Sequence, residues 1–228
     1  MKRIELLDKL KNKPTFSIYD IERIAYCNGD YAKLILNRLK KEGFIKQIRR
    51  NAYTTKDNIL IVASNITYPS YISFWSASYF SGYTEQIVNM VQVATTRRIQ
   101  PIKFEGYEIK FIPLKHFFGY KKIRAEDGEF FIAEDEKLVI DAFLKPKECG
   151  NFDEIEKIFE NANVSEEKII KYLKKVGSQT VIKRVGFLLE KTKGYDISKH
   201  LTLNRNYATL DPFSEKWESI NSKWRVKI

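Results

Sequence analysis

The chain has 228 residues, a formal net charge of +11 at pH 7 and a hydrophobic fraction of 43%. This length suits one large domain, or a small domain joined to a medium one. The hydrophobic fraction is enough for globular cores, which excludes a wholly disordered chain. The sequence pI of about 9.4 indicates a polyanionic partner or surface.

The charge is unevenly distributed along the chain. Residues 1–58 carry 14 Lys/Arg against 7 Asp/Glu, a net +7, and residues 59–125 carry 8 against 3, a net +5. Residues 126–177 carry 8 Lys/Arg against 14 Asp/Glu, a net −6. The front half is therefore basic, and the acidity is concentrated in one internal block.

Two cysteines, Cys27 and Cys149, lie far apart and without CxxC spacing. They indicate a reduced protein without a disulfide framework or a thiolate metal site. The charged first residues lack the apolar stretch of a signal peptide, and no apolar run approaches the ~18 residues of a membrane span. We therefore expect a cytoplasmic protein with no membrane partner.

Two short helices are predicted at the start of the chain. Apolar residues spaced three apart predict a helix over Arg3–Lys11 that ends before Pro14. Ser17 and Asp20 form a capping-box variant, which opens a second helix through Tyr26.

A third helix follows, and Asp30 is expected to cap it. Its expected apolar stripe consists of Tyr31, Leu34, Ile35 and Leu39. The opposite face carries Lys33, Asn37, Lys40 and Lys41. Gly43 stands where a helix end favours a residue that adopts positive φ.

A basic hairpin is predicted directly after this helix. Two extended runs, residues 44–49 and 52–55, are joined at Arg49-Arg50-Asn51. A basic helix followed by a basic hairpin is typical of a winged helix-turn-helix, whose helix enters the major groove while the wing lies along the backbone or minor groove. We predict such a domain over residues 1–58.

The predicted DNA-binding residues are Lys33, Asn37, Lys40, Lys41, Lys46, Arg49 and Arg50. Arg49 and Arg50 suit phosphate or the minor groove, because a guanidinium fork matches such acceptors. Asn37 is the candidate reader of a base edge, since an amide can pair with adenine through two hydrogen bonds. The competing interpretation of the lysines is an ordinary solvated helix face.

Residues 59–228 are expected to form a mixed α/β domain, so the predicted fold class is α+β. Residues 59–63 form a short buried element, and Pro69 is placed in the first turn of a helix. Aromatic residues between Tyr71 and Tyr79 follow helical spacing, which favours core packing over base stacking. This helix is expected to be the central helix of the domain.

Alternating patterns then predict strands over 89–95, 102–104, 107–112 and 129–133, with a turn at Glu105-Gly106. Helices are expected from residue 134 and over 152–161, 165–175 and 179–191, before an extended C-terminal segment. A possible second basic surface comprises Arg97, Arg98, Lys103 and Lys110. Solubility explains it as well as contact with nucleic acid or an acidic partner.

Asp127, Asp135 and Lys137 resemble the D…(D/E)xK layout of metal-dependent nucleases. That layout needs the second acid and the lysine on a strand, whereas this segment is predicted to open a helix. His116 and His200 lack ligand spacing. The sequence therefore predicts no metal, no cofactor and no enzyme, and the nuclease stays an alternative.

Several motifs, in order, resemble the AbiEi family of antitoxins and regulators of type IV toxin–antitoxin (abortive-infection) systems. They are GFIKQIRRNAYTT, PSYISFWSASYFSGYTEQI, VNMVQVATTRR, FFIAEDEKLVIDAF and the ending NYATLDPFSEKW…KWRVKI. The resemblance spans most of the chain. One departure is Asn-Ala-Tyr at residues 51–53, where the family usually shows a glycine before the tyrosine.

This resemblance implies an N-terminal domain that represses its own operon, usually at inverted repeats in double-stranded DNA. It also implies a C-terminal domain that counters a nucleotidyltransferase toxin without a stable complex. An alternative is a stand-alone transcription factor whose second domain senses a ligand or dimerises. An unrelated neighbouring gene would favour that alternative.

Overall fold

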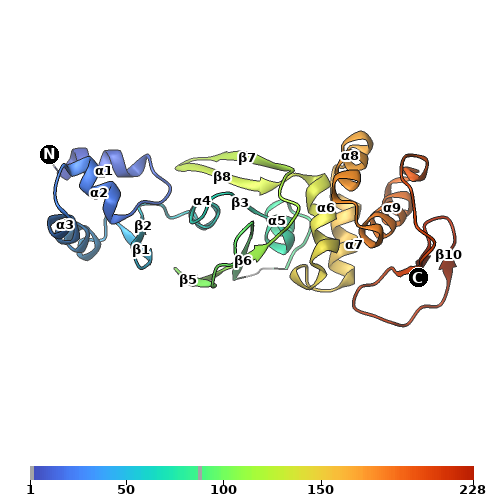
Figure 1. Cartoon of the computed structure of the whole chain (residues 1–228). Helices are drawn as coiled ribbons and strands as arrows, with labels where there is room; N and C mark the ends of the chain where they lie inside the picture. Colours follow the sequence, from blue (N-terminus) through green and yellow to red (C-terminus); the bar gives the residue numbers. More distant parts are fainter. Residues whose placement is uncertain (1–2, 87–88) are drawn as a thin grey trace. The chain divides into compact units, whose positions relative to one another are not determined.

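The computed structural model describes residues 3–86 and 89–228, and these form a mixed α+β chain (Figure 1). Its α-helices are α1 (Arg3–Lys11), α2 (Ile18–Ala25), α3 (Gly29–Lys41), α4 (Ile59–Asn65), α5 (Phe74–Phe80), α6 (Asp135–Leu144), α7 (Phe152–Asn161), α8 (Glu166–Val176) and α9 (Gln179–Lys193). Its strands are β1 (Lys46–Arg49), β2 (Ala52–Thr54), β3 (Ser70–Ile72), β4 (Met90–Thr95), β5 (Ile102–Phe104), β6 (Tyr107–Pro113), β7 (Tyr120–Ala125), β8 (Gly128–Ala133), β9 (Ala208–Thr209), β10 (Ile220–Asn221) and β11 (Val226–Lys227).

The chain divides into two compact units, each built from several segments. The first contains residues 1–72, 89–113 and 122–132, and the second contains residues 73–88, 114–121 and 133–228. No helix within the described residues is long and apolar enough to cross a membrane.

Three helices and a hairpin begin the first unit and share one core. That core contains Leu6, Leu10, Phe16, Ile21, Ala32, Leu36, Leu39 and Ile45. Helix α1 has the predicted bounds, and the Asp20 carboxylate accepts a 2.8 Å hydrogen bond from the Ser17 N–H, as the capping box predicts. Gly43 has φ 76°, so the predicted glycine stop is confirmed.

Two details of α3 differ from the expectation. Asn28 caps the helix, accepting a 3.0 Å hydrogen bond from the Tyr31 N–H, whereas Asp30 already lies inside the first turn. The buried face consists of Ala32, Leu36 and Leu39, and Ile35 packs against the same core, so the predicted stripe is confirmed at Ile35 and Leu39 but wrong at Tyr31 and Leu34. Both side chains are exposed.

A six-stranded mixed sheet follows, with the strand order β5-β6-β4-β3-β8-β7. Strand β4 pairs in parallel with β6, and β3 joins β4 to β8 through Ile72 opposite Ile132. The predicted strands and the turn at Glu105-Gly106 are present. The predicted helix start at Pro69 was wrong, because residues 70–72 form a fully buried strand. Strand β7 was not predicted.

Helix α6 is the centre of the second unit, since its residues 136–143 are all buried. It packs against α5, α7, α8 and α9. The aromatic segment predicted as the central helix is instead divided between β3 and the seven-residue α5. The helices predicted from residue 134 and over 152–161, 165–175 and 179–191 are confirmed within two residues at their ends.

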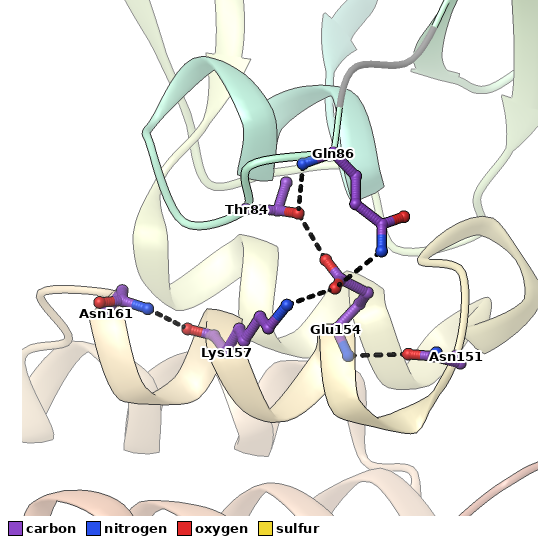
Figure 2. Close-up of polar contacts among 6 residues, drawn as sticks. All are labelled: Thr84, Gln86, Asn151, Glu154, Lys157 and Asn161. Carbon is purple, nitrogen blue, oxygen red and sulfur yellow. Dashed lines mark hydrogen bonds and ion pairs between the residues drawn. The ribbon is translucent and has the colours of Figure 1, made fainter.

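A buried glutamate attaches the segment after α5 to α7, as Figure 2 shows. The Glu154 carboxylate accepts hydrogen bonds from Thr84 Oγ1 at 2.5 Å, Lys157 Nζ at 2.7 Å and Gln86 Nε2 at 3.4 Å. Burial alone would raise the pKa of Glu154, but these donors hold it below its usual value. Two of these donors follow α5 and the third belongs to α7, so the cluster holds the segment after α5 against α7.

The C-terminal segment is extended, as predicted, and forms a small sheet of order β10-β11-β9. Trp224, two residues before β11, is fully buried against Gly186 of α9. Its indole N–H donates to Glu190 one turn further along α9. Trp224 and Val226 are thereby part of the core of the second unit.

Candidate nucleic-acid interface

Side chains from α3 and the hairpin tip surround one open hollow of about 350 Å³ in the first unit. The residues that line it are Ile18, Lys33, Leu36, Asn37, Arg50, Asn51 and Tyr53. Three of the predicted DNA-binding residues, Lys33, Asn37 and Arg50, are therefore brought together, and all three are exposed. A helix face and a hairpin arginine thus converge although they are separated in sequence.

The hairpin tip is fixed to the helices by Asn51. This residue adopts a left-handed backbone with φ 57°, and its Oδ1 accepts a 2.9 Å hydrogen bond from the Ile18 N–H at the start of α2. Behind the tip, Phe16 and Tyr53 exchange backbone hydrogen bonds of 2.9 and 2.8 Å. The two-residue turn Arg50-Asn51 therefore has a defined position beside α3.

The role of Asn51 was missed in the sequence, which showed it only as part of the turn. A signal was present, because asparagine is one of the few residues other than glycine that adopt positive φ readily. It supplies here the backbone freedom for which a glycine is the usual residue in this kind of turn.

Two lysines of α3 make contacts that leave them available to an anion. Lys33 lies 3.0 Å from Asp30, but the side chains are 66% and 92% exposed, and such surface pairs contribute little. Lys40 donates a 3.0 Å hydrogen bond to Gln47 of β1, joining the helix to the hairpin. Lys41 is exposed at the end of α3 and does not line the hollow.

The two hairpin arginines differ from Lys46. Within the described ranges 3–86 and 89–228, neither Arg49 nor Arg50 has an ion-pair partner, and both are exposed. Lys46 lies 2.8 Å from Asp57 and 2.8 Å from Glu105. Asp57, followed by Glu105, raises the pKa of Lys46. Lys46 is thus already neutralised by two carboxylates.

The predicted second basic surface is spread along one side of the sheet. Arg97 and Arg98 are exposed between β4 and β5, and Lys103 is exposed on β5. Lys110 is half-buried on β6, opposite Gln92 of β4.

The nuclease layout is not assembled. Asp127 follows β7, whereas Asp135 and Lys137 lie on α6 rather than on a strand. Lys137 is fully buried and ion-paired with Asp141, and burial lowers the pKa of Lys137. Asp135 accepts hydrogen bonds of 2.9 Å from Tyr83 Oη and the Asn163 N–H. Across the part of the chain that the structure describes, no three His, Cys, Asp or Glu residues are grouped to hold a metal.

Comparisons with known proteins add no assignment. No family model matches the chain. A comparison with curated proteins also finds no match.

Proposed function

We propose that residues 1–58 form a winged helix-turn-helix domain that binds double-stranded DNA, with α3 in the major groove and the hairpin along the backbone or minor groove. The observation that supports this most directly is the convergence of Lys33, Asn37 and Arg50 on one hollow. Recognition helices and wings of this class place base-reading and phosphate-binding side chains side by side in the same way.

The proposed roles follow from the chemistry of each side chain. Lys33, Lys40 and Lys41 contact phosphates, as do Arg49 and Arg50 at the hairpin tip, where a guanidinium can also enter the minor groove. Asn37 reads an adenine edge. Lys46, which is paired with Asp57 and Glu105, positions the hairpin rather than contacting DNA directly.

The proposed biological role is that of a cytoplasmic repressor and antitoxin. It rests on the resemblance to the AbiEi family. In this proposal the first domain represses its own operon at an inverted repeat. Residues 59–228 form an α/β domain that counters a nucleotidyltransferase toxin without forming a stable complex. No enzymatic activity and no cofactor belong to this proposal.

DNA binding is tested by fluorescence anisotropy with a duplex from upstream of the gene and a scrambled duplex of equal length. For about three to five phosphate contacts, the slope of log K against log salt concentration is expected near −3 to −5 per bound DNA-binding domain. Arg49→Ala with Arg50→Ala should weaken binding to both duplexes. Asn37→Ala should weaken binding to the upstream duplex more than to the scrambled one.

Lys199→Ala is the control for a lost surface charge, since Lys199 is exposed near the C-terminal segment and outside the proposed interface. A slope near zero for the unchanged protein would contradict DNA binding through the Lys/Arg surface. Equal losses on both duplexes for Asn37→Ala would show that Asn37 does not read sequence.

The antitoxin role is tested by growth of cells that express the neighbouring reading frame, alone and with this protein. Toxicity that is relieved by the full chain, and still relieved by a variant with Arg49→Ala and Arg50→Ala, would support an antitoxin role separate from DNA binding. Toxicity that the full chain leaves unchanged, or a harmless neighbour, would contradict it and favour a stand-alone regulator.

A further inference from the structure

Three basic residues lie along an outer edge of the six-stranded sheet. Strand β5 is the first strand in the order of that sheet, so one of its sides pairs with no other strand among the described residues. Lys103 points outward from β5, between the buried residues Ile102 and Phe104. Arg97 and Arg98 are exposed in the segment that leads into β5. We call Arg97, Arg98 and Lys103 the edge track.

The edge track starts beside the basic hairpin. Lys46 of β1 lies 2.8 Å from Glu105, which directly follows β5, and all these residues belong to the first compact unit. Lys103 precedes Glu105 by two strand residues, about 7 Å along the chain. The hairpin and the edge track are therefore neighbouring parts of one surface.

The charges of the edge track are largely uncompensated. Among the residues that the structure describes, none of the three has an ion-pair partner. Glu108 lies opposite Lys103 across the β5–β6 pair, but no ion pair forms between them. The basic residues at the other edge of the sheet differ, because Glu129 lies 2.9 Å from Lys122 and 3.3 Å from Arg124.

Lys46 reduces the negative charge that lies between the hairpin and the edge track. A carboxylate between two basic groups would repel a nearby phosphate. Here Lys46 lies 2.8 Å from both Asp57 and Glu105, so it offsets one of their two negative charges and leaves a single net negative charge at this point. The exposed Arg49 and Arg50 of the hairpin and the three residues of the edge track outweigh that charge, so the surface as a whole remains attractive to a polyanion.

We infer that the edge track is a second contact with the DNA backbone, continuous with the contact made by the hairpin. Its ligand is the phosphate backbone of the duplex that α3 and the hairpin bind, so the inference rests on the proposed function. DNA is favoured over an acidic protein because the edge track continues a surface whose other part carries the unpaired Arg49 and Arg50. The edge track contributes affinity without reading sequence.

The test compares two triple variants of the full chain by fluorescence anisotropy, on a mixed-sequence duplex of about 40 base pairs, over a range of salt concentrations. The first is Arg97→Ala, Arg98→Ala and Lys103→Ala. The control is Lys171→Ala, Lys174→Ala and Lys199→Ala, which removes the same charge from exposed residues of the second unit. Circular dichroism establishes that both variants are folded.

The edge-track variant should bind at least about tenfold more weakly at low salt, and its log–log slope should be shallower by about 2 to 3, because each lost phosphate contact removes about 0.9. The control should keep the slope of the unchanged protein. Binding by the unchanged protein together with equal behaviour of the two variants would overturn the inference and leave an acidic protein as the partner of the edge track. A complete lack of binding by the unchanged protein would overturn the proposed function itself.

Discussion

The side chain of Asn51 at the hairpin tip accepts a 2.9 Å hydrogen bond from the backbone N–H of Ile18, 33 residues earlier. Ile18 is the first residue of α2, so its N–H has no partner within the helix. One side chain thus completes the helix start and sets the position of Arg50. Asn51 thus attaches the hairpin tip of the proposed DNA surface to α2.

We predict that Asn51→Ala destabilises the protein by about 2 kcal/mol, because it loses one hydrogen bond and places a less tolerant residue at positive φ. Asn51→Gly keeps the backbone conformation and loses only the hydrogen bond, so its loss should be smaller, about 1 kcal/mol. Urea unfolding measures both. Equal losses of stability in the two variants would show that the backbone conformation of Asn51 contributes nothing. The affinity for DNA should fall in both variants.

The stability of the first unit is expected to depend on pH through the carboxylate of Asp20. Burial alone would raise the pKa of Asp20, but hydrogen bonds from Ser17 and Lys13 hold it below its usual value of 3.8. Because the pKa of Asp20 is lowered in the folded protein, the stability that this carboxylate contributes is fully present above its pKa in the unfolded chain. This stability is lost as the pH falls through the pKa of the folded state.

Asp20→Asn should therefore reduce the free energy of unfolding by about 1 kcal/mol at pH 7, and the difference from the unchanged protein should shrink below pH 3.8. Urea unfolding over a range of pH measures this. The control is Asp30→Asn, because Asp30 is 92% exposed and carries the same charge. A difference that persists unchanged at low pH would contradict the role of the Asp20 carboxylate.

Local signals in the sequence predicted the ends of the elements better than their faces. Ser165 caps α8 and Gly43 follows α3 as expected, because both act on residues next to them in the sequence. Tyr31 was predicted on the buried face of α3, but whether it is buried depends on where α1 and α2 pack against α3. Strand β7 was missed because it is an exposed edge strand, whose residues lack a buried face.

The candidate site was predictable residue by residue but not as an arrangement. The basic residues of α3 and the hairpin were recognised from their spacing. The pairing of Lys46 with Glu105 joins residues 59 positions apart. A periodic pattern in the sequence does not predict a contact between residues so far apart. The hydrogen bond from Ile18 to Asn51 was hidden for the same reason. Sequence patterns predicted which charged residues form the surface, whereas the fold determines which of them are engaged in ion pairs.

In the second unit, Gly186 should not tolerate a side chain. A Cβ at this position would overlap the Trp224 ring, and the ring is fully buried. Although alanine is a better helix former than glycine, overpacking should make Gly186→Ala destabilising by about 1 to 3 kcal/mol. Thermal unfolding followed by circular dichroism measures the change.

The control for this substitution is Gly29→Ala in α3, where the added Cβ meets only the flexible end of the Glu22 side chain. It should change stability little. Trp224→Phe combined with Gly186→Ala should destabilise less than the sum of the single changes, because the smaller ring relieves the overlap. Additive losses would show that Gly186 and Trp224 do not compete for the same space.

Lys137 and Asp141 form an ion pair one helical turn apart in the centre of the second unit, and both side chains are completely buried. Asp141 also accepts a 2.9 Å hydrogen bond from Ser73 at the start of α5. Lys137→Met removes the ammonium and leaves a buried carboxylate, so we expect a loss of about 3 to 5 kcal/mol. Combining it with Asp141→Asn removes both charges and should recover at least about 1 kcal/mol. Urea unfolding of the single and double variants measures the coupling.

Lys9→Met is the matched control, because the Lys9–Glu5 pair has the same spacing but is about half exposed and should contribute under about 0.5 kcal/mol. A double variant no more stable than Lys137→Met alone would mean that the loss comes from packing of the lysine stem rather than from an uncompensated charge.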